Sequence, residues 1–428
     1  MKKFLKLSAI AALLIGSSSS AIEFTPIGYK AISMGGAGVA SAGSSLAGYY
    51  NPALLGKVKT TVEISLGGGL SARDNGAGES VQKLNDSGFT EAYNRLNNDP
   101  TEGGNLAQVQ KDRQTLLDSK NIILDMDGKG VILNPDAYIG AQIMNFGFGI
   151  YGQTEGAGAA EVDTTRTKLI VGNDTDGYVD VETNAISSKA EYESSSMVYA
   201  AESGLTYLDI NAIVLAEVPL SYGHNFETSL GDVSVGASLK FMRGTTYAGK
   251  VNIDTAGSNI TDALSNSETT SSTFGFDLGV LYEPSMVHDL HLGLVGKNLN
   301  SPSFGVSGRS DYTLDPMLRL GVAYDIFDSL EVAFDMDLTK NKTAFKDFDT
   351  QYMGGGANFH MSWFSVRAGL MSNTASSLEG LIYTGGVAVG PSFLQLDLSG
   401  QYASNTAMVD GTSYPTYSKI NVALISRW

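Results

Sequence analysis

Cysteine is absent from the 428-residue sequence. Disulfide frameworks, thiolate metal sites and cysteine nucleophiles are therefore excluded. Basic residues are scarce as well, with 28 Lys and Arg against 45 Asp and Glu and a formal net charge of −17. Such a chain repels phosphate backbones, so we expect no nucleic acid among its partners. Proline is limited to 10 residues, whereas glycine reaches 50 and tyrosine 20, a balance that favours paired strands over a helical enzyme.

The first 21 residues have the pattern of a secretory signal peptide. Lys2, Lys3 and Lys6 form a basic start, an apolar run follows over 7–16, and small side chains lead up to Ala21. The run is too short to span a bilayer, and no long apolar stretch occurs after it. We expect residues 1–21 to be cleaved, leaving a chain that is soluble in the periplasm, secreted, or a β-barrel.

Alternation of apolar with small or polar residues decides between these options. In 318–325 every second residue is apolar, and the residues between are Arg319, Gly321, Ala323 and Asp325. A period of two gives a strand one apolar face and one small or polar face. A face rich in glycine, serine and alanine with occasional charges suits a barrel lumen better than the outside of a soluble sandwich. Segments of about ten residues match a strand that crosses a bilayer at a tilt.

These segments predict an all-β fold, a transmembrane antiparallel β-barrel of about 14 strands, and bacterial barrels require an even number. Two long polar insertions, at about 70–135 and 154–211, are expected to be external loops, the first partly helical around 103–117. The expected strands are 60–68, 136–143, 147–153, 212–223, 232–244, 273–283, 290–297, 316–325, 329–339, 351–361, 364–373, 380–390, 392–403 and 416–428.

The sequence ends on an amphipathic segment and an aromatic residue. Ile420, Val422 and Leu424 share one parity with Trp428. A terminal strand of this kind resembles the assembly signal of bacterial outer-membrane proteins, with Trp428 as its last residue. It implies barrel-assembly machinery and outer-membrane lipid as partners, while an ordinary last strand is the alternative.

The most specific motifs follow the signal peptide. Residues 31–40 read AISMGGAGVA and residues 48–55 read GYYNPALL. They resemble the FadL-type (long-chain fatty-acid transporter) superfamily of outer-membrane barrels, whose members carry a Met-Gly-Gly-Ala-like run and an Asn-Pro-Ala box before the first strand. The resemblance implies that residues 22–58 fold as a plug inside a barrel of residues 59–428, with small residues where the chain approaches the wall. The candidate plug residues are Met34, Gly35, Gly36, Gly38, Asn51, Pro52 and Ala53.

Further motifs lie in the C-terminal half. Residues 293–299 read GLVGKNL, 318–324 read LRLGVAY, 334–339 read FDMDLT and 366–370 read VRAGL. They look like the branch of the same superfamily that is known as conjugal-transfer TraF-type proteins. The similarity spans most of 25–428 and says little about the cargo.

Signals for catalysis, cofactors and metals are weak. Gly36 and Gly38 begin a G-x-G-x-x pattern, but Ser41 replaces the third glycine and no strand precedes it. The acidic segment 173–180 is interpreted as a turn, because Thr183 stands where a calcium loop needs a glutamate. The four histidines lack metal-ligand spacing, and no G-x-S-x-G motif is present. We therefore predict no metal, no cofactor and no enzymatic activity.

Charged residues on the small-residue face are the remaining candidates for function. A charge inside a narrow barrel needs a partner or water, so these groups are expected to pair with one another or with the plug. Alternatively some of them line a transport path, with Arg319 and Arg367 as candidates for an anionic head group. The set comprises Lys240, Asp277, Lys297, Arg319, Glu331, Asp335, Asp337, Arg367 and Asp397.

The resemblance implies a monomeric barrel in the outer membrane of a Gram-negative bacterium. Its expected function is passive uptake of small hydrophobic molecules past the plug. The alternative, which the TraF-type resemblance implies, is a non-transporting envelope component that assists conjugal transfer or surface assembly through the two long loops. A barrel phospholipase is a third hypothesis.

Overall fold

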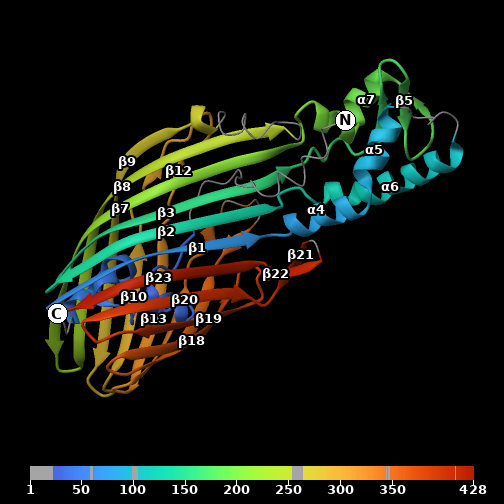
Figure 1. Ribbon diagram of the computed structural model, residues 1–428. Coiled ribbons are helices and arrows are strands. Elements are labelled where there is room, and N and C mark those ends of the chain that lie inside the picture. The colour runs from blue at the N-terminus through green and yellow to red at the C-terminus, as the bar shows by residue number, and fades with distance from the viewer. Residues whose placement is uncertain are drawn as a thin grey trace.

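Figure 1 shows the computed structural model, which describes residues 23–57, 61–98, 105–252, 264–343, 345, 348–409 and 411–428. The expected signal peptide, residues 1–21, lies outside the described residues. Fourteen strands of the described chain close into one antiparallel barrel, which confirms the predicted fold. In order around the wall they are β1 (Val62–Asp74), β2 (Gly130–Ile143), β3 (Phe146–Glu161), β7 (Tyr207–Thr228), β8 (Gly231–Asn252), β9 (Thr269–Pro284), β10 (Leu290–Lys297), β13 (Met317–Phe327), β14 (Leu330–Asp337), β17 (Tyr352–His360), β18 (Phe364–Asn373), β19 (Leu381–Val389), β20 (Leu394–Ala403) and β23 (Tyr417–Arg427).

The first and last strands close the barrel. β1 and β23 pair antiparallel from Glu63↔Arg427 to Arg73↔Tyr417. Closure removes the open sheet edge, so the backbone groups of the wall find partners in neighbouring strands. A bilayer core demands this of any backbone that crosses it, because it offers no water for hydrogen bonding.

The apolar side of each strand faces outward. On β23 the side chains of Ile420 and Val422 are exposed, whereas Asn421 and Ala423 between them are buried. The same alternation runs around the wall, because successive side chains of a strand point to opposite faces. The outward faces therefore form an apolar surface suited to lipid, and the inward faces fill the lumen.

Short and long connections lie at opposite ends of the barrel. Residues 144–145 join β2 to β3 and residues 229–230 join β7 to β8, at the end that also holds Trp428 (Figure 1). The long connections lie at the other end. Three of them form small two-stranded sheets: β11 (Ser303–Phe304) with β12 (Tyr312–Thr313), β15 (Asn341–Lys342) with β16 (Asp349–Thr350), and β21 (Thr406–Val409) with β22 (Thr412–Pro415).

Several strands are longer than predicted, and the two insertions are shorter. β1 continues to Asp74 and β2 begins at Gly130, so the first insertion covers 75–129 rather than 70–135. β3 and β7 extend likewise, so the second covers 162–206 rather than 154–211. The strands remain paired beyond the part of the wall that has apolar outward side chains. There, neither face of a strand has to be apolar. The alternation that located the strands therefore fades before the ladder ends.

The two insertions fold together into a cap over the long-connection end (Figure 1). The first contributes α4 (Ala77–Asp86), α5 (Phe89–Asn98) and α6 (Leu106–Leu124); the second contributes β4 (Ile170–Asn173), β5 (Gly177–Asp180), β6 (Ile186–Ser187), α7 (Lys189–Ser195) and α8 (Met197–Glu202). They share one apolar core, in which Leu96 and Leu116 of the first insertion pack with Ile170 and Met197 of the second. Within the described residues, no helix combines the length and apolarity needed to span a membrane.

The N-terminal segment, residues 23–57, lies inside the barrel (Figure 1). It forms α2 (Tyr29–Ser33), the 3-10 helices η2 (Ser44–Leu46) and η3 (Pro52–Lys57), and α3 (Ala47–Tyr50). Helix α2 contacts β18, β19 and β20, whereas η3 contacts β7, β8 and β9. The segment therefore touches widely separated parts of the wall and fills the space between them.

Candidate functional site

Small residues allow the N-terminal segment to pass close to the wall. Gly35 has a φ of +66°, and a Cβ at this position would lie 2.3 Å from the carbonyl oxygen of Leu370 in β18. Its N–H donates to Oγ1 of Thr384 in β19 at 3.0 Å. Gly36 also has a positive φ, of +83°. A side chain at Gly35 would therefore have to displace backbone, which explains the need for glycine there.

The Asn-Pro-Ala sequence ties the segment to the opposite wall. Asn51 is fully buried, and its Nδ2 donates to the carbonyl oxygens of Val39 at 2.9 Å and Val280 at 3.2 Å. Its Oδ1 accepts from the N–H of Ala53 at 3.0 Å. Pro52 packs onto Gly236 of β8, where a Cβ would lie 2.2 Å from the carbonyl carbon of Pro52. One amide side chain thus links two stretches of the segment to β9.

Asp335 of β14 holds the glycine-rich run. One of its carboxylate oxygens, Oδ2, accepts from the N–H groups of Gly38 at 2.8 Å and Val39 at 2.9 Å. Arg319 of β13 lies next to it, with Nε 3.1 Å from Asp337 and a terminal nitrogen 3.7 Å from Asp335. Hydrogen bonds from backbone to a buried carboxylate are of the strong, charge-assisted type. This arrangement connects the N-terminal segment to the charged face of two neighbouring strands.

Most of the other predicted lumen charges form pairs. Lys240 lies 3.0 Å from Asp277, Arg367 contacts Asp397, and Glu331 accepts from Lys30 of the N-terminal segment at 2.6 Å. All nine predicted lumen residues are at most 8% exposed. Ion pairs of this kind hold the lumen side chains in place, because breaking a pair would leave a buried charge without a partner.

Lys297 of β10 is held by aromatic rings. Its ammonium lies 3.8 Å from the centroid of the Tyr49 ring and 4.9 Å from that of Phe24, and it also donates to the carbonyl oxygen of Tyr49. Phe24, Tyr49 and Tyr50 of the N-terminal segment and Tyr151 of β3 make ring contacts with centroids 5.2–5.7 Å apart. We call these four residues the lumen aromatic cluster. It is the aromatic part of the interface between the segment and the wall, which also includes an aliphatic cluster with Met34 and Ala53 of the segment and Leu281 and Ala323 of the wall.

A second polar group near the cap was missed by sequence reasoning. Arg73 lies 2.9 Å from Glu23 and 2.8 Å from Glu379, and it donates to Tyr352 at 2.7 Å. Arg73 falls in a predicted loop and Glu379 in a connection, so strand parity gave no signal for them. Lys419 and Asp136 pair at 2.9 Å. Both lie in predicted strands, at positions whose side chains alternate towards the lumen, so the alternation could have identified them.

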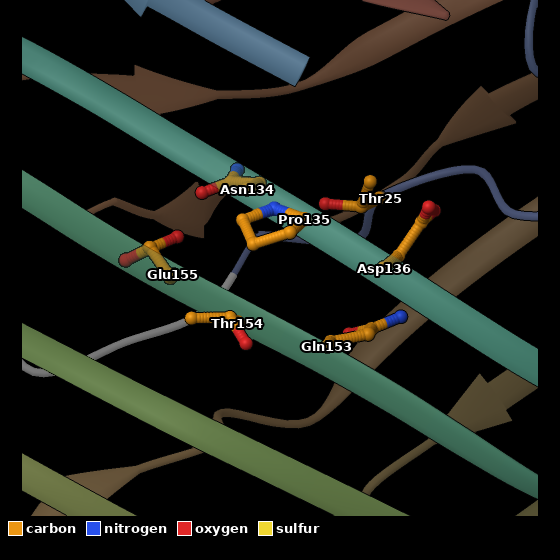
Figure 2. A pocket seen from close by; sticks show the side chains of 7 residues that line it. All are labelled: Thr25, Asn134, Pro135, Asp136, Gln153, Thr154 and Glu155. Carbon is orange, nitrogen blue, oxygen red and sulfur yellow. The ribbon is translucent and has the colours of Figure 1, made fainter. Parts of the chain in front are cut away.

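A small cavity lies between β2, β3 and the N-terminal segment (Figure 2). Its volume of about 10 Å³ is enough for about one water molecule. The wall side is lined by consecutive residues of the two strands, and Thr25 faces them from the lumen. The complete lining is Thr25, Asn134, Pro135, Asp136, Gln153, Thr154 and Glu155.

The remaining predicted residues lie outside the lumen. Trp428 is 71% exposed beside Phe393, and its N–H donates to the carbonyl oxygen of Val62 at 2.9 Å. In the cap, Oδ1 of Asn173 accepts from the N–H groups of Thr175 and Asp176, so a turn lies at 174–176 as predicted, whereas the rest of the predicted turn, Gly177–Asp180, is strand β5. Among the described residues no group of three or more His, Cys, Asp and Glu side chains could hold a metal ion.

Two buried tyrosines of the cap share one carboxylate. Glu202 of α8 accepts from the hydroxyl groups of Tyr93 at 3.0 Å and Tyr192 at 2.7 Å. Burial, reinforced by the Glu202 carboxylate, raises the pKa of both tyrosines above the usual range. Both phenols therefore stay protonated and act as donors, which joins α5 and α7 to α8.

A comparison with solved structures shows that the fold is shared with a known hydrocarbon channel. A mutant of the monoaromatic hydrocarbon channel TodX has a TM-score of 0.50 and 11% identity over 95% of this chain and 99% of that chain. The toluene transporter TbuX of Ralstonia pickettii has a TM-score of 0.48 and 13% identity over 95% and 98%. A FadL homologue of Pseudomonas aeruginosa has a TM-score of 0.46 and 10% identity over 96% and 99%.

No curated protein matches the sequence. A protein family does match, however, over residues 48–337, which is more than half of the chain. The match runs from the Asn-Pro-Ala sequence through the charged strands β13 and β14, so it includes both ends of the contact that Asn51 makes with the wall. Because this match covers more than half of the chain, the chain belongs to the family described as "F plasmid transfer operon, TraF, protein".

Proposed function

We propose that this protein is an outer-membrane barrel for the passive uptake of small hydrophobic molecules past an N-terminal plug, residues 23–57. The observation that carries the proposal is the lumen aromatic cluster. Three of its rings, Phe24, Tyr49 and Tyr50, belong to the plug, and the fourth, Tyr151, belongs to the wall. A small apolar or aromatic ligand that inserts between Tyr49 and Tyr151 replaces a plug–wall contact with a ligand contact. Binding would therefore favour a displaced plug.

The polar lumen favours compact ligands over long acyl chains. A long chain would have to extend past buried ion pairs such as Lys240–Asp277 and Arg367–Asp397, which offer it no apolar surface. A molecule with a single aromatic ring is about as large as one side chain of the lumen aromatic cluster, so it would fit if one of these side chains moved aside. The likeness to the monoaromatic hydrocarbon channel agrees with this choice, although at 11% identity it supports the fold alone.

The aromatic cluster can be tested directly. Toluene binding to the detergent-solubilised protein is to be measured by titration calorimetry for the wild type, for Tyr151→Leu and for Tyr222→Leu. Tyr222 is an outward-facing tyrosine, 45% exposed, and serves as the matched control. We expect saturable binding that weakens about tenfold in Tyr151→Leu only, a change of about 1.4 kcal/mol. Absence of saturable binding to the wild type would refute the proposal.

The location of the protein is part of the same proposal. The apolar outward faces favour outer-membrane lipid as the surroundings, and Trp428, at the end of the closing strand, is proposed as the signal for the assembly machinery. We propose a monomer, because closure leaves no edge strand for pairing. We propose no enzymatic activity; the similar solved structures are described as transporters and channels.

A second candidate function rests on the cap. Its two insertions share a buried core of their own, which is more structure than a loop needs merely to join two strands. As a non-transporting envelope component, the protein would use the cap to bind a partner during conjugal transfer or surface assembly. Capture of one defined partner by the wild type, lost when the cap is replaced by short turns, would favour this function if toluene binding is absent.

A further inference from the structure

The hairpin between β10 and β13 folds into the mouth of the barrel. It comprises β11, β12 and the turn between them, residues 303–313. A guanidinium nitrogen of Arg309 lies 2.8 Å from Asp209 of β7, and the Tyr312 hydroxyl donates to Glu155 of β3 at 3.2 Å. In the wall, β8 and β9 lie between β7 and β10. The hairpin therefore crosses the lumen side of two strands to reach its contacts.

Phe304 of β11 fills an apolar pocket in the wall. It is 1% exposed and packs in one cluster with Ile213 and Leu215 of β7 and Met242 of β8. Gly244 of β8 leaves room for the ring, because a Cβ there would lie 2.5 Å from Cδ1 of Phe304. Inward-facing residues of the wall thus form a site for one aromatic ring, and a residue of the hairpin occupies it.

Polar contacts hold the hairpin in place. Both terminal nitrogens of Arg309 bind the carboxylate of Asp209, and the Arg309 side chain is 24% exposed. The backbone of Gly305 donates to Oγ of Ser271 at 3.1 Å and accepts from Oγ1 of Thr246 at 2.6 Å. Water can replace each of these contacts when the hairpin lifts. The pocket, by contrast, favours an apolar occupant over water.

A row of contacts links the pocket to the lumen aromatic cluster. Tyr312 belongs to the same apolar cluster as Phe304, and its hydroxyl donates to Glu155. Glu155 and Thr25 of the N-terminal segment border the same small cavity (Figure 2). The hydroxyl of Tyr49, in the lumen aromatic cluster, donates to the carbonyl oxygen of Thr25 at 2.7 Å. The site at the mouth is therefore connected to the rings deeper in the lumen.

We propose that the β11–β12 hairpin is a gate over the lumen, and that a single-ring hydrophobic molecule enters by replacing Phe304 in its pocket. The inference rests on the proposed uptake function and adds to it an entry site and an opening step. A ligand that binds the vacated pocket binds only the open conformation and so favours it. Arg309 and Asp209 form the latch, since their contact is lost on opening. Without ligand the gate stays closed, with Phe304 in the ligand's place.

A disulfide that locks the hairpin tests the gate. A Cβ at Gly305 would lie 3.5 Å from Cγ2 of Thr269 in β9, so Gly305→Cys with Thr269→Cys can form a bridge in a chain without other cysteines. Exchange of 4-fluorotoluene with the detergent-solubilised protein is to be measured by fluorine NMR, after the bridge is verified by mass. We expect the association rate to fall about tenfold on oxidation and to recover on reduction. Gly305→Cys alone is the control, and equal rates with and without the bridge would overturn the gate.

A measurement without ligand separates the gate from the uptake function. Met242→Cys places a thiol in the wall of the pocket, at a position that is 0% exposed, and its labelling by a methanethiosulfonate reagent reports opening. Adding Arg309→Met removes the latch and should raise the labelling rate about tenfold, whereas Arg243→Met, at an exposed position of β8, should leave it unchanged.

The two measurements together have distinct outcomes. Labelling that responds to Arg309→Met, without binding of 4-fluorotoluene to the wild type, would refute the uptake function and support the gate. Binding to the wild type with labelling that does not respond to Arg309→Met would refute the gate and leave the uptake function supported.

Discussion

Gly35 illustrates how one residue determines the fit of the N-terminal segment. Its φ of +66° is almost the same as the +68° of Gly308, but only Gly35 has backbone atoms where a Cβ would lie. Gly35→Ala and Gly308→Ala therefore share the same left-handed strain and differ in the clash. We expect Gly35→Ala to lower the unfolding free energy by about 1–3 kcal/mol more than Gly308→Ala, as overpacking does. Denaturant unfolding of both variants in detergent measures the difference, and equal losses would contradict it.

Asp335 is a second position where one side chain controls the segment. Asp335→Asn keeps the shape of the side chain but removes its negative charge. That charge strengthens the hydrogen bonds from the N–H groups of Gly38 and Val39 and balances the charge of Arg319. Removing one partner of a buried charged group costs about 3–5 kcal/mol. We expect a lower melting temperature and a higher single-channel conductance in planar bilayers, because the N-terminal segment is held less firmly in the lumen. Asp328→Asn, at an exposed turn residue, should behave as the wild type; unchanged conductance in Asp335→Asn would refute a holding role.

At the scale of elements, the cap is expected to unfold separately from the barrel. Leu116 of α6 is fully buried in the cap core, whereas Leu106 of the same helix is 73% exposed. Leu116→Ala should destabilise the cap by about 2–5 kcal/mol, and Leu106→Ala should have little effect. Limited proteolysis checks this: faster cleavage within 75–129 is expected in Leu116→Ala only, with the barrel still resistant. Loss of the barrel together with the cap would show that the two form one cooperative unit.

The elements that could be predicted from the sequence are those under strong physical constraint. A strand between lipid and a filled lumen must alternate, and on this basis all fourteen wall strands were predicted, with β10 and β18 at their observed limits. Beyond the bilayer the constraint ends, so the continuation of β1 to Asp74 was missed. The cap was missed as a folded unit, because its core joins helices and strands of two insertions that no periodicity connects.

For the candidate site, parity predicted which residues face inward but not what they contact. Asp335 was expected in the lumen, yet its bonds to Gly38 and Val39 join positions almost 300 residues apart. Arg73 and Glu379 are 306 positions apart, and neither lies in a predicted strand. Such contacts depend on the closure of the whole barrel and on the path of the N-terminal segment through it, which the local sequence pattern does not encode. The functional roles of the predicted site residues remain predictions.

At the scale of the whole molecule, stability depends on the match between the outward face and lipid. Val422 lies near the middle of the closing strand β23 and is 48% exposed, whereas Leu230 is 72% exposed in the turn between β7 and β8. Arginine on the lipid face costs about 2–4 kcal/mol at the bilayer midplane and about 0–1 near the interface. We therefore expect Val422→Arg to lower the unfolding free energy in phospholipid vesicles by about 2–4 kcal/mol, and Leu230→Arg to change it little. Guanidinium titration of the refolded barrels measures both. Equal stability of the two variants would mean that β23 does not face the hydrocarbon core, and the membrane assignment of the barrel would then be wrong.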